Sequence, residues 1–215
     1  PSLEQTIEKP NTQSTSDAIK EAFGSKSYIL LVSGFFVCGF HITLVGTHVP
    51  KYVIDRGLED WTAAMILSLI GFFNIIGSVL AGYLGKSNSK KYFLAIIYTG
   101  RTLASIIFIV LPITPMSVVI FSIVMGALWL ATVPLTAGII GYIYGLKYMG
   151  TLYGIVFLSH QIGSFVGVWL GGWFYDLYGS YDIVWWVGIS VGAFSAIIHL
   201  PVKEKPLIDR KVINV

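Results

Sequence analysis

Six long apolar runs joined by short polar connections make up most of this chain. They cover residues 28–49, 62–84, 92–111, 116–139, 150–173 and 183–200. A helix of about 20 apolar residues crosses a hydrocarbon core about 30 Å thick, whereas the spans of a β-barrel are shorter and alternate in polarity. The pattern therefore predicts an all-α membrane protein with six transmembrane helices, whose short connections place consecutive helices antiparallel in a compact bundle.

Composition agrees with a protein embedded in a lipid bilayer. Charged residues are only 12% of the 215 positions, about half of the roughly 25% found in soluble proteins. The net charge of +3 gives no indication of nucleic-acid binding, and the single Cys38 permits no intrachain disulfide. The expected domains are a flexible polar segment at 1–26 with a short amphipathic turn at 17–23, a bundle at 27–201, and a C-terminal tail at 202–215.

Basic residues fall unevenly on the two sides of the predicted bundle. Lys51 and Arg56 lie on one side, and the other side carries Lys9, Lys20, Lys26, Lys86, Lys90, Lys91, Lys147, Lys203, Lys205, Arg210 and Lys211. Because loops rich in Lys and Arg stay in the cytoplasm, both termini are expected there. The membrane would be the cytoplasmic membrane, that is, an inner or a plasma membrane.

Arg101 is the one basic residue inside an apolar run. It lies ten positions beyond Lys91, which places it about 15 Å deeper along a helix, near the middle of the bilayer. A cation there costs about 2.5–3.5 kcal/mol. Since no Asp or Glu lies inside any of the runs, its counter-charge must be a bound anion, another polypeptide, or water and carbonyl groups. We favour a functional role, as is usual for intramembrane charges.

Other polar or aromatic side chains also fall at mid-depth. Together with Arg101 they form the predicted substrate-binding set, whose other members are His41, Asn74, Tyr98, Trp129, His160 and Gln161. Four of them have a simpler explanation: the two histidines could hydrogen-bond across helices, Asn74 is better explained in that way, and Trp129 is better explained as core packing.

Two further features of the runs predict local structure. Pro134 predicts a kink in the fourth run because proline cannot donate to the helix ladder. Gly163, Gly167 and Gly171 repeat every four residues, a spacing that lets another helix approach closely.

The connection after the second run carries a family likeness. Residues 82–91 read Gly-Tyr-Leu-Gly-Lys-Ser-Asn-Ser-Lys-Lys and resemble the signature loop of the major facilitator superfamily, which runs through glycine, leucine and a small residue to an acidic residue, a turn and two basic residues. Gly82, Lys90 and Lys91 match this signature, while Lys86 occupies the acidic position. The resemblance implies a cytoplasmic gating loop without the family's acidic residue.

A second likeness lies near the end of the chain. Residues 171–181 read Gly-Gly-Trp-Phe-Tyr-Asp-Leu-Tyr-Gly-Ser-Tyr, which is similar to the turn between the last two helices of monocarboxylate and oxalate/formate-type facilitators. The residues themselves indicate a tight outer hairpin in which Gly179 adopts a positive φ.

The resemblance covers residues 27–201 and implies half of a twelve-helix facilitator fold. Such transporters have two six-helix halves, each a three-plus-three inverted repeat, and this chain is similar to the C-terminal half, helices 7–12. The chain begins with Pro, so we expect a fragment or a processed chain whose partner is an N-terminal six-helix half. The implied function is secondary active transport of a small organic anion such as a monocarboxylate, with His41 and His160 as candidates for a coupled proton.

Two alternatives stay open from the sequence. One is a self-contained six-helix protein that acts as a homodimeric carrier or channel. The other is a membrane-embedded enzyme, but Ser159 with His160, and His41 with His48, lack carboxylate partners and match neither a metalloprotease nor a nucleophile-elbow motif. We therefore expect no catalytic residues, no metal and no other cofactor.

Overall fold

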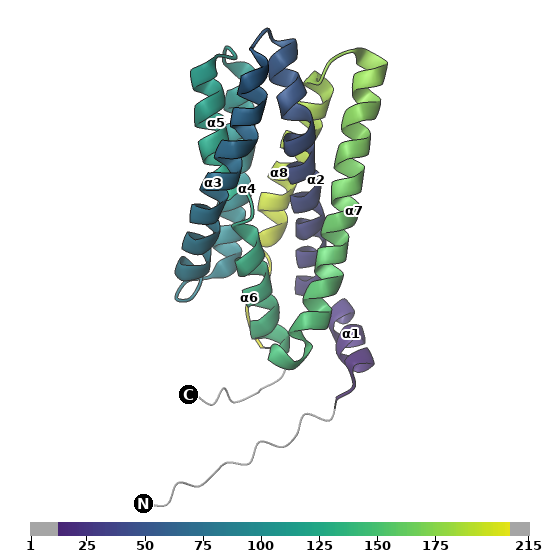
Figure 1. Ribbon diagram of the computed structural model, residues 1–215. Coiled ribbons are helices and arrows are strands. Elements are labelled where there is room, and N and C mark those ends of the chain that lie inside the picture. Colours follow the sequence, from purple (N-terminus) through teal and green to yellow (C-terminus); the bar gives the residue numbers. More distant parts are fainter. Residues whose placement is uncertain (1–12, 207–215) are drawn as a thin grey trace, which may run out of the picture.

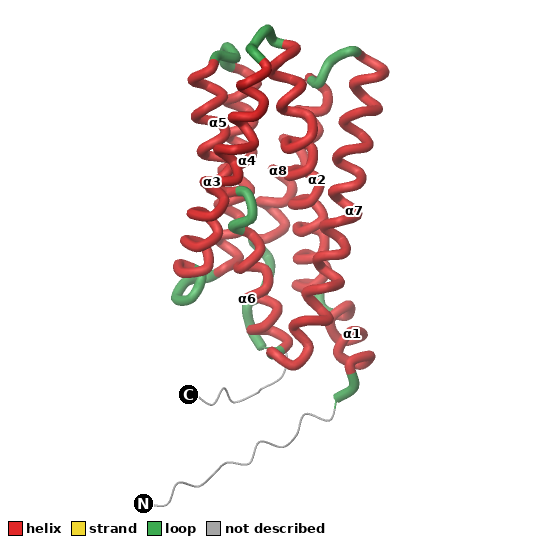
Figure 2. Tube along the Cα trace, in the orientation of Figure 1, coloured by secondary structure: helices red, strands yellow, loops and turns green. Residues whose placement is uncertain are grey.

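The protein is described here from a computed structural model, in which residues 13–206 are placed and form a helical bundle (Figures 1 and 2). Predictions that concern residues 1–12 and 207–215 lie outside the described residues. Every regular element within 13–206 is a helix. The helices are α1 (Thr15–Gly24), α2 (Lys26–Asp55), α3 (Asp60–Leu84), α4 (Lys90–Val110), α5 (Pro115–Leu128), α6 (Thr132–Tyr144), α7 (Leu146–Tyr178) and α8 (Asp182–His199).

The six predicted runs correspond to six spans that are long and apolar enough to cross a membrane within the described part of the chain. α2 and α7 extend beyond the predicted limits, because their last turns contain polar residues that the apolar pattern leaves out. The short helix α1 includes the predicted amphipathic turn and buries Ala18 and Ala22. The fourth run differs most, since it forms two helices, α5 and α6, within one span.

Connections alternate between the two ends of the bundle. The α2–α3, α4–α5 and α7–α8 connections lie at the end drawn uppermost, and the α3–α4 and α6–α7 connections lie at the other end with α1 (Figure 1). Lys51 and Arg56 are therefore at the upper end. The remaining described lysines, which are Lys20, Lys26, Lys86, Lys90, Lys91, Lys147, Lys203 and Lys205, lie at the lower end or in the segments leading into it.

Three helix pairs dominate the packing: α2 with α7, α3 with α5, and α4 with α8. A three-plus-three inverted repeat exchanges α2 with the α5–α6 span, α3 with α7, and α4 with α8. This exchange converts the α2–α7 contact into the α5–α3 contact and leaves the α4–α8 contact unchanged. The pairing is therefore the one that the predicted repeat produces.

Glycines allow α2 and α7 to touch along their backbones. A Cβ atom added at Gly163 would lie 2.0 Å from the Phe36 carbonyl oxygen, and one added at Gly39 would lie 1.9 Å from the His160 carbonyl oxygen. Gly167 and Gly171 are equally crowded, against the Phe40 backbone and the His48 ring. The predicted small-residue ladder is therefore confirmed as the surface where α7 packs on α2.

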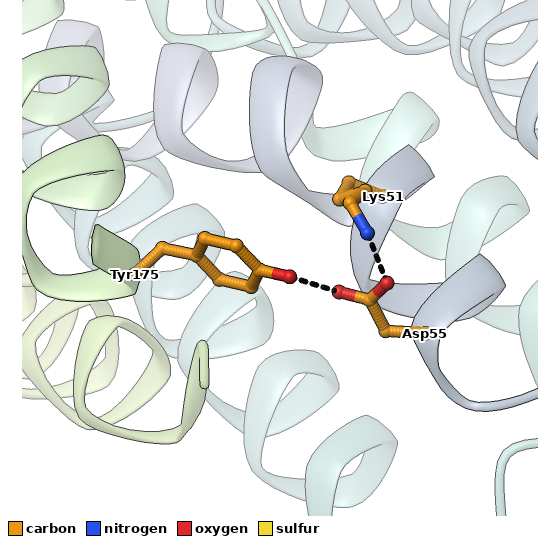
Figure 3. Close-up of polar contacts among 3 residues, drawn as sticks. All are labelled: Lys51, Asp55 and Tyr175. Atoms are coloured by element: carbon orange, nitrogen blue, oxygen red, sulfur yellow. Dashed lines mark hydrogen bonds and ion pairs between the residues drawn. The ribbon is translucent and has the colours of Figure 1, made fainter. Parts of the chain in front are cut away.

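Polar contacts tie the upper end of α2 to its neighbours. The Lys51 ammonium pairs with the Asp55 carboxylate, which also accepts a hydrogen bond of 3.1 Å from the Tyr175 hydroxyl on α7 (Figure 3). Just beyond α2, the Arg56 guanidinium lies 2.9 Å from the Asp182 carboxylate, at the start of α8. The α7–α8 turn itself ends α7 at Gly179 with φ of 64°, as predicted. These contacts hold α2, α7 and α8 together at one end.

The segment after α8 closes the lower end of the bundle. The Glu204 carboxylate accepts a hydrogen bond from the Lys91 backbone N–H, and it lies 3.2 Å from the Ser89 hydroxyl. The Lys203 backbone N–H donates to the Ser27 hydroxyl at 2.9 Å. The residues that follow the last span therefore satisfy the first turn of α4, where backbone N–H groups have no partner within the helix.

Candidate functional site

The candidate site is built around the break in the fourth span, which Figure 2 shows as a loop at mid-height of the bundle. α5 ends at Leu128 and α6 begins at Thr132. Pro134 has no N–H to offer Leu130, and the Leu130 carbonyl instead accepts a bond of 2.9 Å from Val133, one residue closer than in an α-helix. The predicted kink is therefore a complete interruption just before Pro134. It frees backbone groups that must find partners elsewhere.

Arg101 on α4 bonds the carbonyl groups that the break frees. Its Nε and Nη2 donate to the Leu128 carbonyl at 3.0 and 2.6 Å, and Nη2 also donates to the Trp129 carbonyl. The guanidinium is 0% exposed. It also sits at the C-terminal end of α5, where the helix dipole is negative. The sequence analysis left several possible counter-charges for Arg101. Among the described residues, the structure shows backbone carbonyl groups in this role.

Asn74 on α3 binds the other side of the same break. Its side-chain oxygen accepts a hydrogen bond of 3.0 Å from the Leu130 backbone N–H, and it lies 3.2 Å from the Ser78 hydroxyl one turn away. The structural explanation favoured for Asn74, a hydrogen bond between helices, is therefore present. Arg101 and Asn74 together satisfy the loop between α5 and α6 from two different helices.

The rest of the Arg101 environment is polar but uncharged. The Cys38 sulfur lies 3.6 Å from Nη1 and 3.2 Å from the Thr132 hydroxyl. The guanidinium stands 5.3 Å from the centre of the Tyr98 ring, whose hydroxyl donates to the Gly34 carbonyl at 2.8 Å. The sequence analysis did not single out Cys38 as a partner of Arg101. Its position one turn from His41 was the available signal.

His41 and His160 are both buried, at 2% and 7% exposure. The Nδ1 atom of His160 lies 3.0 Å from the Gln161 side-chain oxygen, and its ring stacks on Phe157. The Nε2 atoms of both histidines have no hydrogen-bond partner among residues 13–206. Both Nε2 atoms are enclosed by the surrounding residues, so neither is presented at the surface of this half. Gln161 is exposed on α7.

Trp129 lies in the break itself, partly exposed, with its ring packed towards Gly46 on α2. Its indole N–H makes no hydrogen bond within the described part of the chain. Packing against the apolar cluster formed by α2, α3, α4, α5 and α8 explains part of its surface. The remaining surface and the free donor stay accessible.

His199, the last residue of α8, lies inside the bundle. It is 1% exposed, its ring stacks on Tyr98 at 5.0 Å, and its Nδ1 lies 2.7 Å from the Ser195 carbonyl. A histidine in the last turn of a span can fold back along its own helix, and the apolar pattern does not show this.

The predicted gating loop connects α3 to α4 at the lower end. Lys86 is exposed, whereas the Lys90 side chain runs along α6 next to Gly138. The Lys91 ammonium donates to the Leu200 carbonyl at 3.0 Å. Gly82 lies in the last turn of α3 and faces Pro134. The loop thus contacts both the fourth span and the end of α8, while its gating role stays a prediction.

These features define a polytopic helical membrane protein with a polar centre and no ion pair at that centre. Both ion pairs among residues 13–206 lie at the upper end, and no cluster of three potential metal ligands occurs in that range. A family profile described as Major Facilitator Superfamily matches residues 1–168. The chain belongs to the Major Facilitator Superfamily.

Similar proteins support the same assignment. An uncharacterized MFS-type transporter, YcxA, from Bacillus subtilis is 30% identical over 85% of this chain and 44% of its own length. Monocarboxylate transporter 12-B of Danio rerio is 26% identical over 80% of the chain and 39% of its own length. Monocarboxylate transporter 12 of Mus musculus is 24% identical over 79% and 37%. The predicted resemblance to the monocarboxylate-like branch is thus confirmed at the level of relatives.

The chain spans well under half the length of these relatives, between 37% and 44%. With six candidate spans in the described residues, it corresponds to half of a facilitator fold. The family and these relatives are transporters and not enzymes. The embedded-enzyme alternative is therefore dropped.

Proposed function

We propose that this chain is the C-terminal half of a secondary transporter that moves a small organic anion, such as a monocarboxylate, by alternating access. Residues 27–201 would form helices 7–12, with 1–26 as the end of the central cytoplasmic loop and 202–215 as the C-terminal tail. The basic lower end would face the cytoplasm, in an inner or plasma membrane. The substrate would bind near the midplane, between this half and the N-terminal half.

The observation that carries this proposal is the buried positive charge of Arg101. Its partners are carbonyl groups and a sulfur, and no carboxylate among residues 13–206 pairs with it. With an effective dielectric constant of about 20, one unit charge attracts an anion about 10 Å away by about 1.7 kcal/mol. A monoanion at the wall of the bundle would therefore be favoured more than tenfold. A neutral solute of the same shape would not gain this energy.

Arg101 would act on the anion through its electric field and not by direct contact, because its guanidinium is fully buried within this half. Groups closer to the surface would make direct contact: the Gln161 amide and the Trp129 ring. His160 is buried with its Nδ1 against the Gln161 side-chain oxygen, and it would act on the anion through Gln161. Tyr98 and Asn74 would orient these groups through the Arg101 environment. His41 and His160 are the proposed carriers of a coupled proton, because an imidazole nitrogen can take up and release a proton.

Uptake by the full-length carrier in proteoliposomes tests the proposal. Radiolabelled pyruvate is the anionic probe, and a neutral amide of similar size is the control solute. Arg101→Gln removes the charge and should abolish the preference for the anion, whereas Arg101→Lys keeps the charge and should retain part of it. If Arg101→Gln takes up pyruvate at the unmutated rate, with equal protein in the liposomes, Arg101 has no role in anion transport.

A further inference from the structure

We propose that Asn74 and Arg101 are positioning residues that fix the Trp129 indole, and that its N–H donates a hydrogen bond to the carboxylate of the transported anion. The second part of this inference rests on the proposed function, while the first part concerns only this chain. Three observations carry it: the bonding of the peptide groups on either side of Trp129, the direction of its ring, and its free donor.

All four polar groups of the two peptides that flank the Trp129 Cα are bonded. In the preceding peptide, the Leu128 carbonyl accepts from Arg101 and the Trp129 N–H donates to Gly126 at 3.0 Å. In the following peptide, the Trp129 carbonyl accepts from Arg101 and the Leu130 N–H donates to Asn74. Because each peptide is planar, fixing both planes fixes φ and ψ at this residue. The direction of the Cα–Cβ bond is then fixed as well.

No regular helix holds the residue in this place. Trp129 follows the last residue of α5 and precedes the first residue of α6. Its conformation therefore depends on side chains from α3 and α4 and not on an uninterrupted hydrogen-bond ladder. Capping the end of α5 would need only one of these two side chains. Here Arg101 from α4 and Asn74 from α3 both bond the peptide groups around Trp129.

The ring that these bonds direct has an unused donor. Trp129 lies at the centre of the fourth span, 14 residues after Pro115, and it is partly exposed beside Gly46. An indole N–H is a donor only, and this one has no acceptor among residues 13–206. Hydrogen bonds to an ionised acceptor are the strong ones. A carboxylate near Arg101 is thus the acceptor that both the charge and the free donor favour.

The positioning step can be measured without transport. The full-length carrier is labelled with 5-fluorotryptophan, and the Trp129 signal is assigned by its loss in Trp129→Phe. Asn74→Leu, which has similar volume but no acceptor, should move the Trp129 fluorine resonance. Ser68→Ala is the matched control, because it removes a hydroxyl from the same helix whose bond is to the Ala64 carbonyl, and it leaves the Asn74–Leu130 bond intact. If Asn74→Leu yields no folded protein, Asn74→Ala replaces it.

The binding step uses sodium pyruvate as the probe and sodium chloride as the control salt. Pyruvate should move the Trp129 resonance in the unmutated carrier. In uptake assays, Trp129→Phe should raise KM for pyruvate about tenfold, the effect of one hydrogen bond to a charged group, and kcat should change little. Trp186→Phe, at an exposed position on α8, should leave KM unchanged.

A double-variant cycle links the two steps. If Asn74 acts through Trp129, Asn74→Leu combined with Trp129→Phe should raise KM no more than Trp129→Phe alone. Additive effects would overturn the positioning role, as would a Trp129 resonance that Asn74→Leu leaves in place. If the carrier transports pyruvate but pyruvate does not shift the Trp129 fluorine resonance, the proposed hydrogen bond to the anion is wrong. If the unmutated carrier takes up no pyruvate, the proposed function fails for this probe, and the shift caused by Asn74→Leu still decides the positioning role.

Discussion

The close approach of α2 and α7 predicts opposite effects for the same substitution at two glycines of one helix. A Cβ added at Gly163 would lie 2.0 Å from the Phe36 carbonyl oxygen, and contacts under 3.0 Å are essentially never seen. Gly163→Ala must therefore push the two helices apart by at least about 1 Å. Because the obstacle is backbone and not a flexible side chain, no rotamer change can relieve it. Gly154, on the same helix, has nothing within 4 Å of the added atom.

The magnitude follows from two opposing terms. Replacing glycine by alanine inside a helix gains about 1 kcal/mol of helix propensity, and this gain applies at both positions. Overpacking a close contact costs about 1–3 kcal/mol and applies only to Gly163→Ala, which also separates the neighbouring glycines of the ladder from α2. Because the propensity gain cancels between the two variants, Gly163→Ala should be about 1–3 kcal/mol less stable than Gly154→Ala.

Thermal unfolding of the purified full-length carrier in one detergent checks this difference. Gly154→Ala should unfold at or above the unmutated temperature, and Gly163→Ala should unfold several degrees below Gly154→Ala. Gly172→Ala, beside the ladder but with an open environment, is a second control. Equal unfolding temperatures for Gly163→Ala and Gly154→Ala would show that the two helices do not meet along this surface.

Two further predictions concern the ends of the bundle. Single cysteines introduced at Lys86 and at Arg56, in a carrier with Cys38 replaced by serine, should react with a membrane-impermeant maleimide from opposite sides of sealed vesicles; labelling of both from one side would contradict the arrangement of the connections. Asp55→Asn should lower the unfolding temperature only slightly, because exposed ion pairs contribute little, and a large loss would mean that the Asp55 contacts with Lys51 and Tyr175 govern the stability of the α2–α7 pair.

The apolar pattern predicted the spans because their length is set by the bilayer. The spacing of Gly163, Gly167 and Gly171 predicted a surface for close helix packing, because these residues leave one side of a helix bare, but it did not identify α2 as the partner. The interruption of the fourth span was only partly predictable. Pro134 shows that the ladder is disturbed, but the extent of the disturbance depends on whether other helices can bond the freed groups.

The identity of those bonding groups needed the structure. Arg101 and Asn74 lie on different helices and are 27 positions apart in the sequence, so no spacing within one run connects them. The sequence showed that Arg101 lacked a carboxylate, and this led to the expectation of direct substrate contact. It could not show that backbone carbonyls 27 and 28 residues away would be turned towards the guanidinium. The sequence predicted the buried charge of Arg101, but it could not predict which groups would hydrogen-bond to that charge.

The bond between Glu204 and the start of α4 has a practical consequence for anyone who expresses this protein. A reporter fused directly after the last span, or a stop codon placed there to trim the chain, would remove the carboxylate that accepts from the Lys91 N–H and the backbone group that reaches Ser27. The lower end of the bundle would then lose the contacts that join the segment after α8 to α2 and α4, although every membrane-crossing helix was still encoded. Affinity tags are better attached beyond Pro206, where they leave the hydrogen bonds of Lys203 and Glu204 intact.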